Sequence, residues 1–481
     1  MGLFPAVLDW LHLAGALLVL IALQLVQFII VWSYHLFPFP GLLDAVYNRS
    51  RQLQGWFHLH LKPTDVEGRR SARELVESEG FYFENHFLTT EDGFVLVLHR
   101  VIAPSGLTAK STTAATIAAA AGNGGNSGDM GCGNGDDSCG VSVANGGSND
   151  GVPNGGGARM GSKMASGPKN GKKVRPPILL MHGLMQDSEA LLCGGRDHSL
   201  ALILAANGYD VFVGNNRGNR YSHKNLSKAP HEERYWDFSI DELARLDVPA
   251  MVHHVLATTG AEKAVYIGFS QGSAQAFAAL SSNAALQSKV ALMVALSPAA
   301  RAQGLAKSLL SSLVAANLRF LNLLFGRRRV LPTTLMWQRI MSRDTFVRAV
   351  DQAMLYLFTW RSTMVSPERK RQLYPHIYSY SSVKCVSHWF QMIRSRRLAM
   401  FEDAPPGQYI PVAYDITQIK IPVALFYGGR DTIVEVASLC KTLPRCVLAY
   451  CEPDFEHLDT MWGDIAAKTI FPKVLALLRD L

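Results

Sequence analysis

Short apolar segments alternate with helical patterns through most of the chain, and this alternation restricts the fold more than any other feature of the sequence. The segments are rich in Val, Leu and Ile, which is typical of strands buried on both faces. They cover residues 176–183, 209–216, 264–270, 290–298, 422–429 and 446–453. Helical periodicity is clear over residues 241–260 and again near the C-terminus. This order predicts an α/β fold, with a mostly parallel central sheet and helices on both faces.

A hairpin and a low-complexity segment precede these strands. Residues 84–102 read as two strands joined by a turn at Asp92 and Gly93. Residues 104–176 consist mainly of Gly, Asn, Ser, Ala and Asp. Such a composition cannot bury enough apolar area to offset the entropy lost on ordering. We therefore expect a disordered surface insertion between two parts of one fold.

Between residues 300 and 411 the alternation stops, and the sequence becomes helix-like, basic and apolar. We interpret this stretch as a helical cap, or lid, inserted into the sheet fold. The expected division is a hydrophobic membrane anchor at 1–47, an N-terminal region at 48–103, the insertion at 104–176, the first part of the core at 177–299, the cap at 300–411 and the second part of the core at 412–481.

The N-terminal segment has the length and composition of a membrane anchor. Residues 13–32 are apolar, and no charged residue occurs between Asp9 and Asp44. About 20 helical residues span the hydrocarbon core of a bilayer. A cleaved signal peptide is the alternative, but residues 1–12 contain no Lys or Arg. Prolines and a glycine at 38–41 leave two forms open: a single span, or a hairpin that enters one leaflet.

Charge and cysteine usage bear on location and partners. The first basic residues after the apolar segment are Arg49, Arg51 and Lys62, which places the long C-terminal part in the cytosol by the positive-inside tendency. The 47 Lys and Arg residues outnumber 39 Asp and Glu, but their clusters are widely separated. This spacing argues against nucleic-acid binding and fits a solvated surface or anionic lipid headgroups.

The seven scattered cysteines show no metal-ligand spacing, so we expect reduced thiols, no metal and no cofactor.

A serine lies between two glycines in the sequence "VYIGFSQGSAQA". The strand that ends at Phe269 passes directly into a small-residue helical pattern, so Ser270 is expected on a sharp, exposed turn. Side chains at Gly268 and Gly272 would clash across this nucleophile elbow, and the helix N-terminus favours developing negative charge. The pattern also occurs by chance, and an ordinary polar turn is the simpler interpretation of the motif alone.

An acid and a histidine follow the serine in the order that the mechanism requires. Asp431 comes directly after the strand at 422–429, and His457 follows the strand at 446–453. Residues at the carboxyl ends of parallel strands meet at one edge of the sheet. We therefore predict a Ser270, Asp431 and His457 triad for attack on an ester carbonyl. Competing residues are Asp403, Asp454 and Asp459 for the acid and His376 and His388 for the base.

A tetrahedral oxyanion needs two backbone N–H groups aimed at it. The residue after the nucleophile, Gln271, supplies one of them in this kind of elbow. The loop that follows the strand at 176–183 supplies the other, and Leu184 is the candidate there. A plain turn at the end of a strand is the alternative for this loop.

Several segments together resemble the acid lipase family of α/β-hydrolases, which includes lysosomal acid lipases, gastric lipases and fungal steryl ester hydrolases. They are "GFYFENHFLTTEDGFVLVLHRV", "LLMHGLMQDS", "DVFVGNNRGNRYS", "YWDFSIDELARLDVPA", "GFSQGSAQA" and "FEHLDTMWG". The resemblance implies an α/β-hydrolase fold with Ser270, Asp431 and His457 as the triad and Leu184 and Gln271 as the oxyanion residues. The family commonly has His where this chain has Phe269, which is not expected to change the reaction class.

Together with the apolar segment, the resemblance to the membrane-anchored steryl ester hydrolase branch implies a serine ester hydrolase that cleaves sterol esters at a lipid droplet, the endoplasmic reticulum or the plasma membrane. A triacylglycerol or retinyl-ester lipase is the alternative within hydrolases, and so is a relative that transfers the acyl group to an alcohol. An inactive lipid-binding scaffold is the alternative from another class. The expected partners are a lipid ester and a lipid surface, and the sequence does not indicate an oligomeric state.

Overall fold

The computed structural model describes residues 69–104, 175–300, 321–322, 325–330, 334, 338, 341–402 and 410–481. The predicted anchor at 1–47, residues 105–174 of the predicted insertion and residues 301–320 of the predicted cap lie outside this part of the chain. Among the helices that the structure describes, none is long and apolar enough to cross a bilayer.

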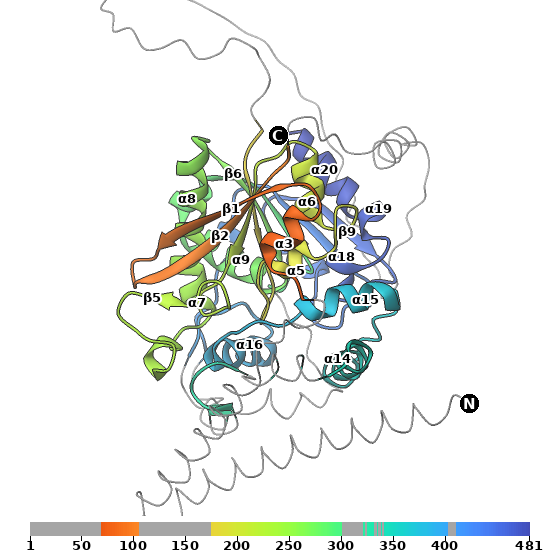
Figure 1. Ribbon diagram of the computed structural model, residues 1–481. Coiled ribbons are helices and arrows are strands. Elements are labelled where there is room, and N and C mark those ends of the chain that lie inside the picture. The colour runs from red at the N-terminus through yellow and green to blue at the C-terminus, as the bar shows by residue number, and fades with distance from the viewer. Residues whose placement is uncertain are drawn as a thin grey trace, which may run out of the picture.

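A nine-stranded sheet forms the centre of the molecule (Figure 1). Its strands are β1 (Tyr82–Thr89), β2 (Phe94–Ile102), β3 (Ile178–Met181), β4 (Val211–Asn215), β5 (Lys224–Asn225), β6 (Ala264–Phe269), β7 (Val290–Leu296), β8 (Val423–Gly428) and β9 (Cys446–Glu452). The order across the sheet is β1-β2-β4-β3-β6-β7-β8-β9, and β5 pairs with β2. Neighbouring strands from β4 to β9 are parallel, whereas β2 is antiparallel to β1 and β4. Every predicted strand therefore lies in this sheet.

Helices cover both faces of the sheet. The α-helices are α3 (Ala72–Glu77), α5 (Glu189–Leu192), α6 (Leu200–Ala206), α7 (Ile240–Glu242), α8 (Val248–Thr259), α9 (Gln271–Ser282), α10 (Ala284–Gln287), α14 (Arg343–Phe358), α15 (Pro367–Leu373), α16 (Val383–Ser395), α17 (Ala437–Thr442), α18 (Asp459–Trp462), α19 (Ala466–Thr469) and α20 (Phe471–Arg479). A π-helical turn, η2 (Leu243–Asp247), connects α7 to α8, and short 3-10 turns are η1 (Glu233–Tyr235), η3 (Tyr374–His376) and η4 (Ile416–Gln418).

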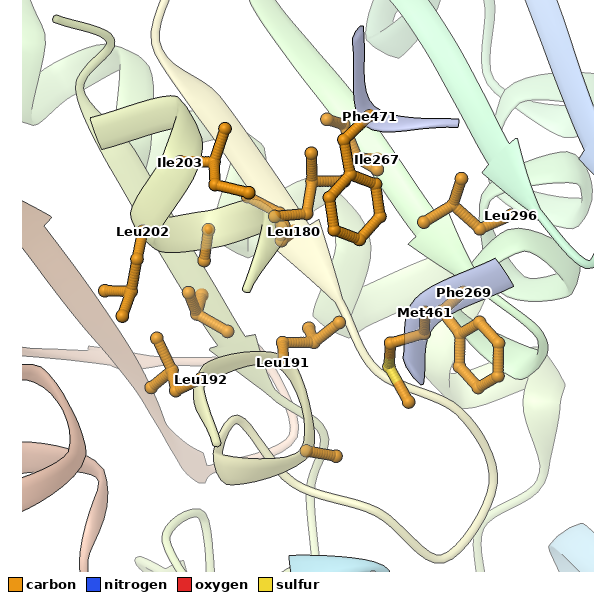
Figure 2. Packing of buried hydrophobic residues seen from close by; sticks show 14 of the residues in the cluster. Leu180, Leu191, Leu192, Leu202, Ile203, Ile267, Phe269, Leu296, Met461 and Phe471 are labelled. Atoms are coloured by element: carbon orange, nitrogen blue, oxygen red, sulfur yellow. The ribbon is translucent and has the colours of Figure 1, made fainter. Parts of the chain in front are cut away.

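The core has two layers because successive strand residues point to opposite faces. In β3, Leu180 packs with α6 and α20 on one face, and Leu179 packs with α8 and α9 on the other. Figure 2 shows the first layer, in which Leu180 and Ile267 of adjacent strands lie near Ile203 of α6 and Phe471 of α20. Each large buried apolar side chain contributes roughly 1.5–3 kcal/mol. This burial holds the strand ends that carry the candidate site.

The described cap helices α14, α15 and α16 lie between β7 and β8 in the sequence and gather at one end of the sheet (Figure 1). Serine side chains cap the N-termini of two of them: Ser342 accepts from the amide of Thr345, and Ser382 accepts from that of Cys385. Thr359 ends α14 in a left-handed conformation, with a φ of 63°. This turn directs the following residue, Trp360, toward the sheet, where it is 4% exposed.

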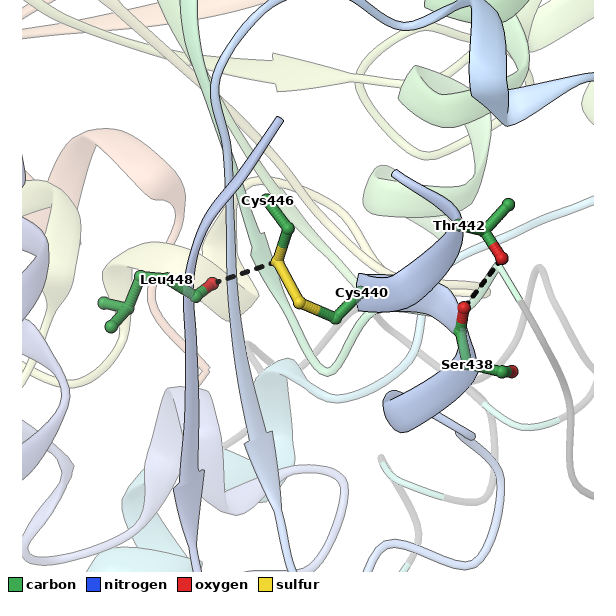
Figure 3. Close-up of a disulfide and its surroundings, with 5 residues drawn as sticks. All are labelled: Ser438, Cys440, Thr442, Cys446 and Leu448. Carbon is green, nitrogen blue, oxygen red and sulfur yellow. Dashed lines mark hydrogen bonds between the residues drawn. A yellow bond between two sulfur atoms is a disulfide. The ribbon is translucent and has the colours of Figure 1, made fainter. Parts of the chain in front are cut away.

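Two cysteines form a disulfide that the sequence did not predict. Cys440 in α17 and Cys446 at the start of β9 are linked, with their Cα atoms 5.6 Å apart (Figure 3). The expectation of reduced thiols is therefore wrong for this pair, although Cys193 and Cys385 are free. Sequence spacing could not show that the end of α17 meets the beginning of the next strand.

Candidate active site

Ser270 lies on the sharp turn between β6 and α9. Its backbone has a φ of 51° and a ψ of −115°, a conformation that non-glycine residues rarely adopt. Such strain persists only where the surrounding structure enforces it, and it is common at functional sites. The Ser270 amide donates to Leu296 O of β7, while the amide of Ala274 in α9 donates to Ser270 O. The turn therefore holds the serine at the carboxyl end of the sheet.

Close backbone contacts explain the two glycines of this elbow. A Cβ atom on Gly268 would lie 2.6 Å from the carbonyl carbon of Gly272. On Gly272 it would lie 2.5 Å from Met181 O at the end of β3. Both distances are shorter than any tolerated contact, so larger side chains would push α9 away from the strands.

Three side chains from separate loops form one hydrogen-bonded chain. The Nε2 atom of His457 lies 2.7 Å from Ser270 Oγ, and its Nδ1 atom lies 2.7 Å from Asp431 Oδ2. An ionised carboxylate only accepts, so Nδ1 carries the proton that it receives, and Nε2 is left to accept from the hydroxyl. His457 is 4% exposed and Asp431 is 7% exposed. This geometry permits transfer of the serine proton to the imidazole.

Backbone contacts fix the two loops that carry Asp431 and His457. The amide of Ile433 donates to Asp431 Oδ1, at 2.9 Å. The amide of Arg430 donates to the Phe455 carbonyl of the neighbouring loop. Ser297 follows β7, and its hydroxyl donates to the His457 carbonyl at 2.7 Å. The acid and the base therefore keep a constant separation because their loops are bonded to each other and to the sheet.

The loop after β3 lies beside the elbow. Gln186 folds back, and its Oε1 atom accepts from the Gly183 amide at 2.9 Å. Met185 has a φ of 56°, and its carbonyl accepts from the amide of Ser379 in the cap. Within the described part of the chain, the backbone amides of Leu184 and Gln271 have no hydrogen-bond acceptor. Both predicted donors are thus available to an incoming oxygen.

A buried ionic cluster lies at the end of the same loop. Asp187 accepts from Arg220 Nε at 2.9 Å, and Glu189 accepts from Arg69 Nε at 3.1 Å. His376 of the cap contacts Glu189 Oε2 through Nδ1, at 2.8 Å. Burial opposes ionisation of Glu189, but the neighbouring His376, Arg69 and Arg220 together hold the pKa of its carboxyl well below the usual range. The cluster ties the oxyanion loop to the cap through paired charges.

The competing acids and bases lie elsewhere. Asp454 pairs with Arg430 at the surface, and Asp459 accepts from the Glu456 amide. His388 contacts the Ala399 carbonyl within the cap. None of these three touches Ser270, and Asp403 lies outside the described residues. No group of three or more His, Cys, Asp or Glu residues in the described ranges could hold a metal ion.

Two tryptophans of the cap contact the site, and no local sequence pattern pointed to either. The Trp389 Nε1–H donates to Gln271 Oε1 at 2.8 Å, and the Trp360 indole stacks on the His457 ring. Both lie in the segment between β7 and β8, whose path depends on tertiary packing. Asp187, in contrast, lies within "LLMHGLMQDS" as a polar residue after a buried strand, and Glu189 follows this segment directly.

A mostly parallel sheet that carries a strained serine between a strand and a helix defines the α/β-hydrolase class of esterases and lipases. The family model described as "alpha/beta hydrolase fold" matches residues 176–464, which is more than half of the chain. The "partial alpha/beta-hydrolase lipase region" matches residues 72–120. The chain therefore belongs to the lipase family of α/β-hydrolases, and it is an enzyme of the lipase and esterase class.

Curated relatives from fungi and animals agree with this assignment. Two probable lipases of Schizosaccharomyces pombe are similar to the chain. One is 32% identical over a region that covers 86% of the chain and 78% of its own length. The other is 30% identical over a region that covers 90% of the chain and 89% of its own length. The gastric triacylglycerol lipase of Homo sapiens is 28% identical over 64% of the chain and 80% of its own length. These similarities imply a lipid ester as the substrate.

Proposed function

We propose that the protein is a membrane-associated serine hydrolase that cleaves sterol esters to a sterol and a fatty acid, with Ser270, His457 and Asp431 as its catalytic triad. The hydrogen-bonded chain from the Ser270 hydroxyl through the imidazole to the carboxylate carries this proposal. An inactive scaffold would not need a strained elbow, a buried acid and two available amides at one place.

In the first half of the reaction, His457 Nε2 takes the proton of Ser270 as Oγ attacks the ester carbonyl. The carbonyl oxygen becomes an oxyanion that accepts from the amides of Leu184 and Gln271. The Asp431 carboxylate stabilises the imidazolium and keeps its Nδ1–H in place. Collapse of the intermediate breaks the bond to the alcohol oxygen, which takes the proton from Nε2 and leaves as the sterol.

In the second half, water replaces the alcohol. His457 accepts one proton from the water as its oxygen attacks the acyl carbon attached to Ser270. The second tetrahedral intermediate then releases Ser270 Oγ, which recovers the proton, and the fatty acid leaves. The same groups therefore serve both steps, and no metal or cofactor is required by this scheme.

Substitution of the nucleophile tests the site. The Ser270→Ala variant should lose on the order of a million-fold in kcat toward a dispersed p-nitrophenyl ester, because removal of one triad member disables the whole unit. The Ser281→Ala variant, which changes a serine near the other end of α9, is the matched control and should keep full activity. Hydrolysis at an unchanged rate by Ser270→Ala would reject the triad assignment.

The substrate class is tested with the same enzyme. A triacylglycerol lipase is the second candidate, because gastric triacylglycerol lipases are among the relatives. The rate is measured on cholesteryl oleate, triolein and p-nitrophenyl butyrate and divided by the rate of spontaneous hydrolysis of the same ester. This ratio should be highest for the sterol ester. A preference for triolein would support the second candidate, and turnover of the short ester alone would reject the lipase proposal.

We also propose that residues 1–47 attach the enzyme to a lipid surface: a lipid droplet, the endoplasmic reticulum or the plasma membrane. The length of the apolar segment supports attachment. The basic residues Arg49, Arg51 and Lys62 favour a cytosolic catalytic domain, whereas the Cys440–Cys446 disulfide favours an oxidising compartment. The disulfide is the stronger of the two indications, because disulfides rarely persist in the reducing cytosol.

A further inference from the structure

The imidazole of His457 is covered by aromatic rings from two elements. The Trp360 indole lies almost parallel to it, with an interplanar angle of 8° and ring centroids 5.1 Å apart. Phe269, at the end of β6, approaches with its ring tilted by 52° at 5.5 Å. Trp360 is itself covered by Phe358, whose ring is stacked on it at 4.4 Å. The ring of the base is therefore held in a dry aromatic environment.

Hydrogen bonds hold Trp360 in this position from both sides of the site. Its Nε1–H donates to Thr432 Oγ1, at 3.2 Å, next to the Asp431 carboxylate. The two amides that follow it, of Arg361 and Ser362, donate to the Glu456 carboxylate at 2.8 and 2.7 Å. Glu456 immediately precedes His457. The indole is thus bonded to the loop of the acid, and the backbone that follows it is bonded to the loop of the base.

A ring in this place affects the protonated form of the base more than the neutral form. The face of an indole carries partial negative charge, and it attracts a cation more strongly than the face of any other side chain. During attack by Ser270 the imidazole becomes an imidazolium, so an indole against its face stabilises the transition state more than the ground state. An aliphatic side chain of similar size would exclude water equally well but would lack this attraction.

We infer that Trp360 is a positioning residue for the reaction: it fixes the plane of the His457 ring and stabilises the imidazolium that forms when Ser270 attacks. This inference rests on the proposed function and adds to it a residue supplied by the cap. It also implies that the segment at 358–362 stays on the sheet when substrate enters, because its departure would remove the support of the base.

The test weakens the attraction between the indole face and a cation while the ring keeps nearly the same size. Trp360 is replaced by tryptophans with one, two or three ring fluorines, placed at this codon only, because fluorine withdraws charge from the ring face. We expect kcat toward p-nitrophenyl butyrate to fall stepwise, to about a tenth with three fluorines, while KM stays within twofold. The acid limb of the kcat profile should move to lower pH, because the imidazolium becomes harder to form.

Two conventional variants complete the comparison, with rates expressed per serine titrated by a fluorophosphonate. Trp360→Leu should behave like the trifluorinated protein, and Trp360→Phe should lose no more than about threefold. Phe358→Leu removes a ring of the same stack that does not touch the base, and it should leave the pH profile unchanged. A kcat independent of fluorine content would overturn the inference while leaving the triad intact, whereas activity in Ser270→Ala would overturn the triad itself.

Discussion

Asp459 is a carboxyl group buried two residues after the imidazole of the site. It is 1% exposed, and burial raises the pKa of Asp459 to about 6, with the neighbouring Glu456 carboxylate acting in the same direction. In an unfolded chain the pKa is about 3.9. Between these values the folded protein binds more protons than the unfolded one. The free energy of unfolding therefore falls as pH rises from about 4 to about 6, by at most about 3 kcal/mol.

The Asp459→Asn variant should remove this dependence. The amide oxygen can still accept from the Glu456 amide, as the carboxylate does at 2.7 Å, but it does not ionise. We expect the variant to match the natural protein near pH 4 and to be more stable at pH 8, by up to about 3 kcal/mol. Urea unfolding at both pH values measures the difference, with the exposed Asp454→Asn as control. If the free energy of unfolding of Asp459→Asn changed with pH in the same way as that of the natural protein, the raised pKa of Asp459 would be contradicted.

The elbow between β6 and α9 depends on one contact with β3. An alanine at position 272 would bring its Cβ to 2.5 Å from Met181 O, directly before the loop that carries Leu184. We expect Gly272→Ala to displace this loop, to lower kcat at least a hundredfold and to cost about 1–3 kcal/mol in stability. Kinetics and denaturant unfolding of the same preparation measure both effects.

Gly260→Ala is the control for this prediction. Gly260 ends α8 with a φ of 70°, and no atom lies within 4 Å of a Cβ built there. The substitution should cost about 1 kcal/mol through backbone strain and leave kcat unchanged. Equal losses of activity in both variants would show that backbone strain in general, and not the contact with Met181, disables the site.

The sequence predicted the elements of the core better than those of the cap. Strands such as β6 and β8 can be predicted from their continuous apolar runs. The carboxyl ends of such strands must meet at one edge of a parallel sheet. The sequence alone therefore predicted that Ser270, Asp431 and His457 lie together. The stack of Trp360 on His457 was not predicted, because it depends on a left-handed turn at Thr359 that no local pattern requires. The Cys440–Cys446 bond was missed for the same reason.

At the scale of the whole molecule, the disulfide bears on which side of the proposed membrane the catalytic domain faces. Cys440 and Cys446 are six residues apart, and closing so short a loop contributes only about 2 kcal/mol. Reduction of the disulfide should therefore leave the enzyme folded and active. Whether Cys440 and Cys446 are linked in cells then indicates which compartment the domain occupies. Stable disulfides are rare in the cytosol, where glutathione keeps thiols reduced.

We accordingly expect the catalytic domain to face an oxidising compartment, which favours a membrane over the cytosolic surface of a lipid droplet. Cells that express the full chain are treated with a thiol-alkylating reagent, and sealed membrane vesicles from them are treated with protease. The peptides of Cys440 and Cys446 should be recovered linked, and the domain should resist protease until detergent opens the vesicles. Deletion of residues 1–40 should release the protein from the membrane while it stays active on a dispersed ester. Alkylated cysteines together with digestion in sealed vesicles would instead place the domain in the cytosol, as the basic residues after the apolar segment predict.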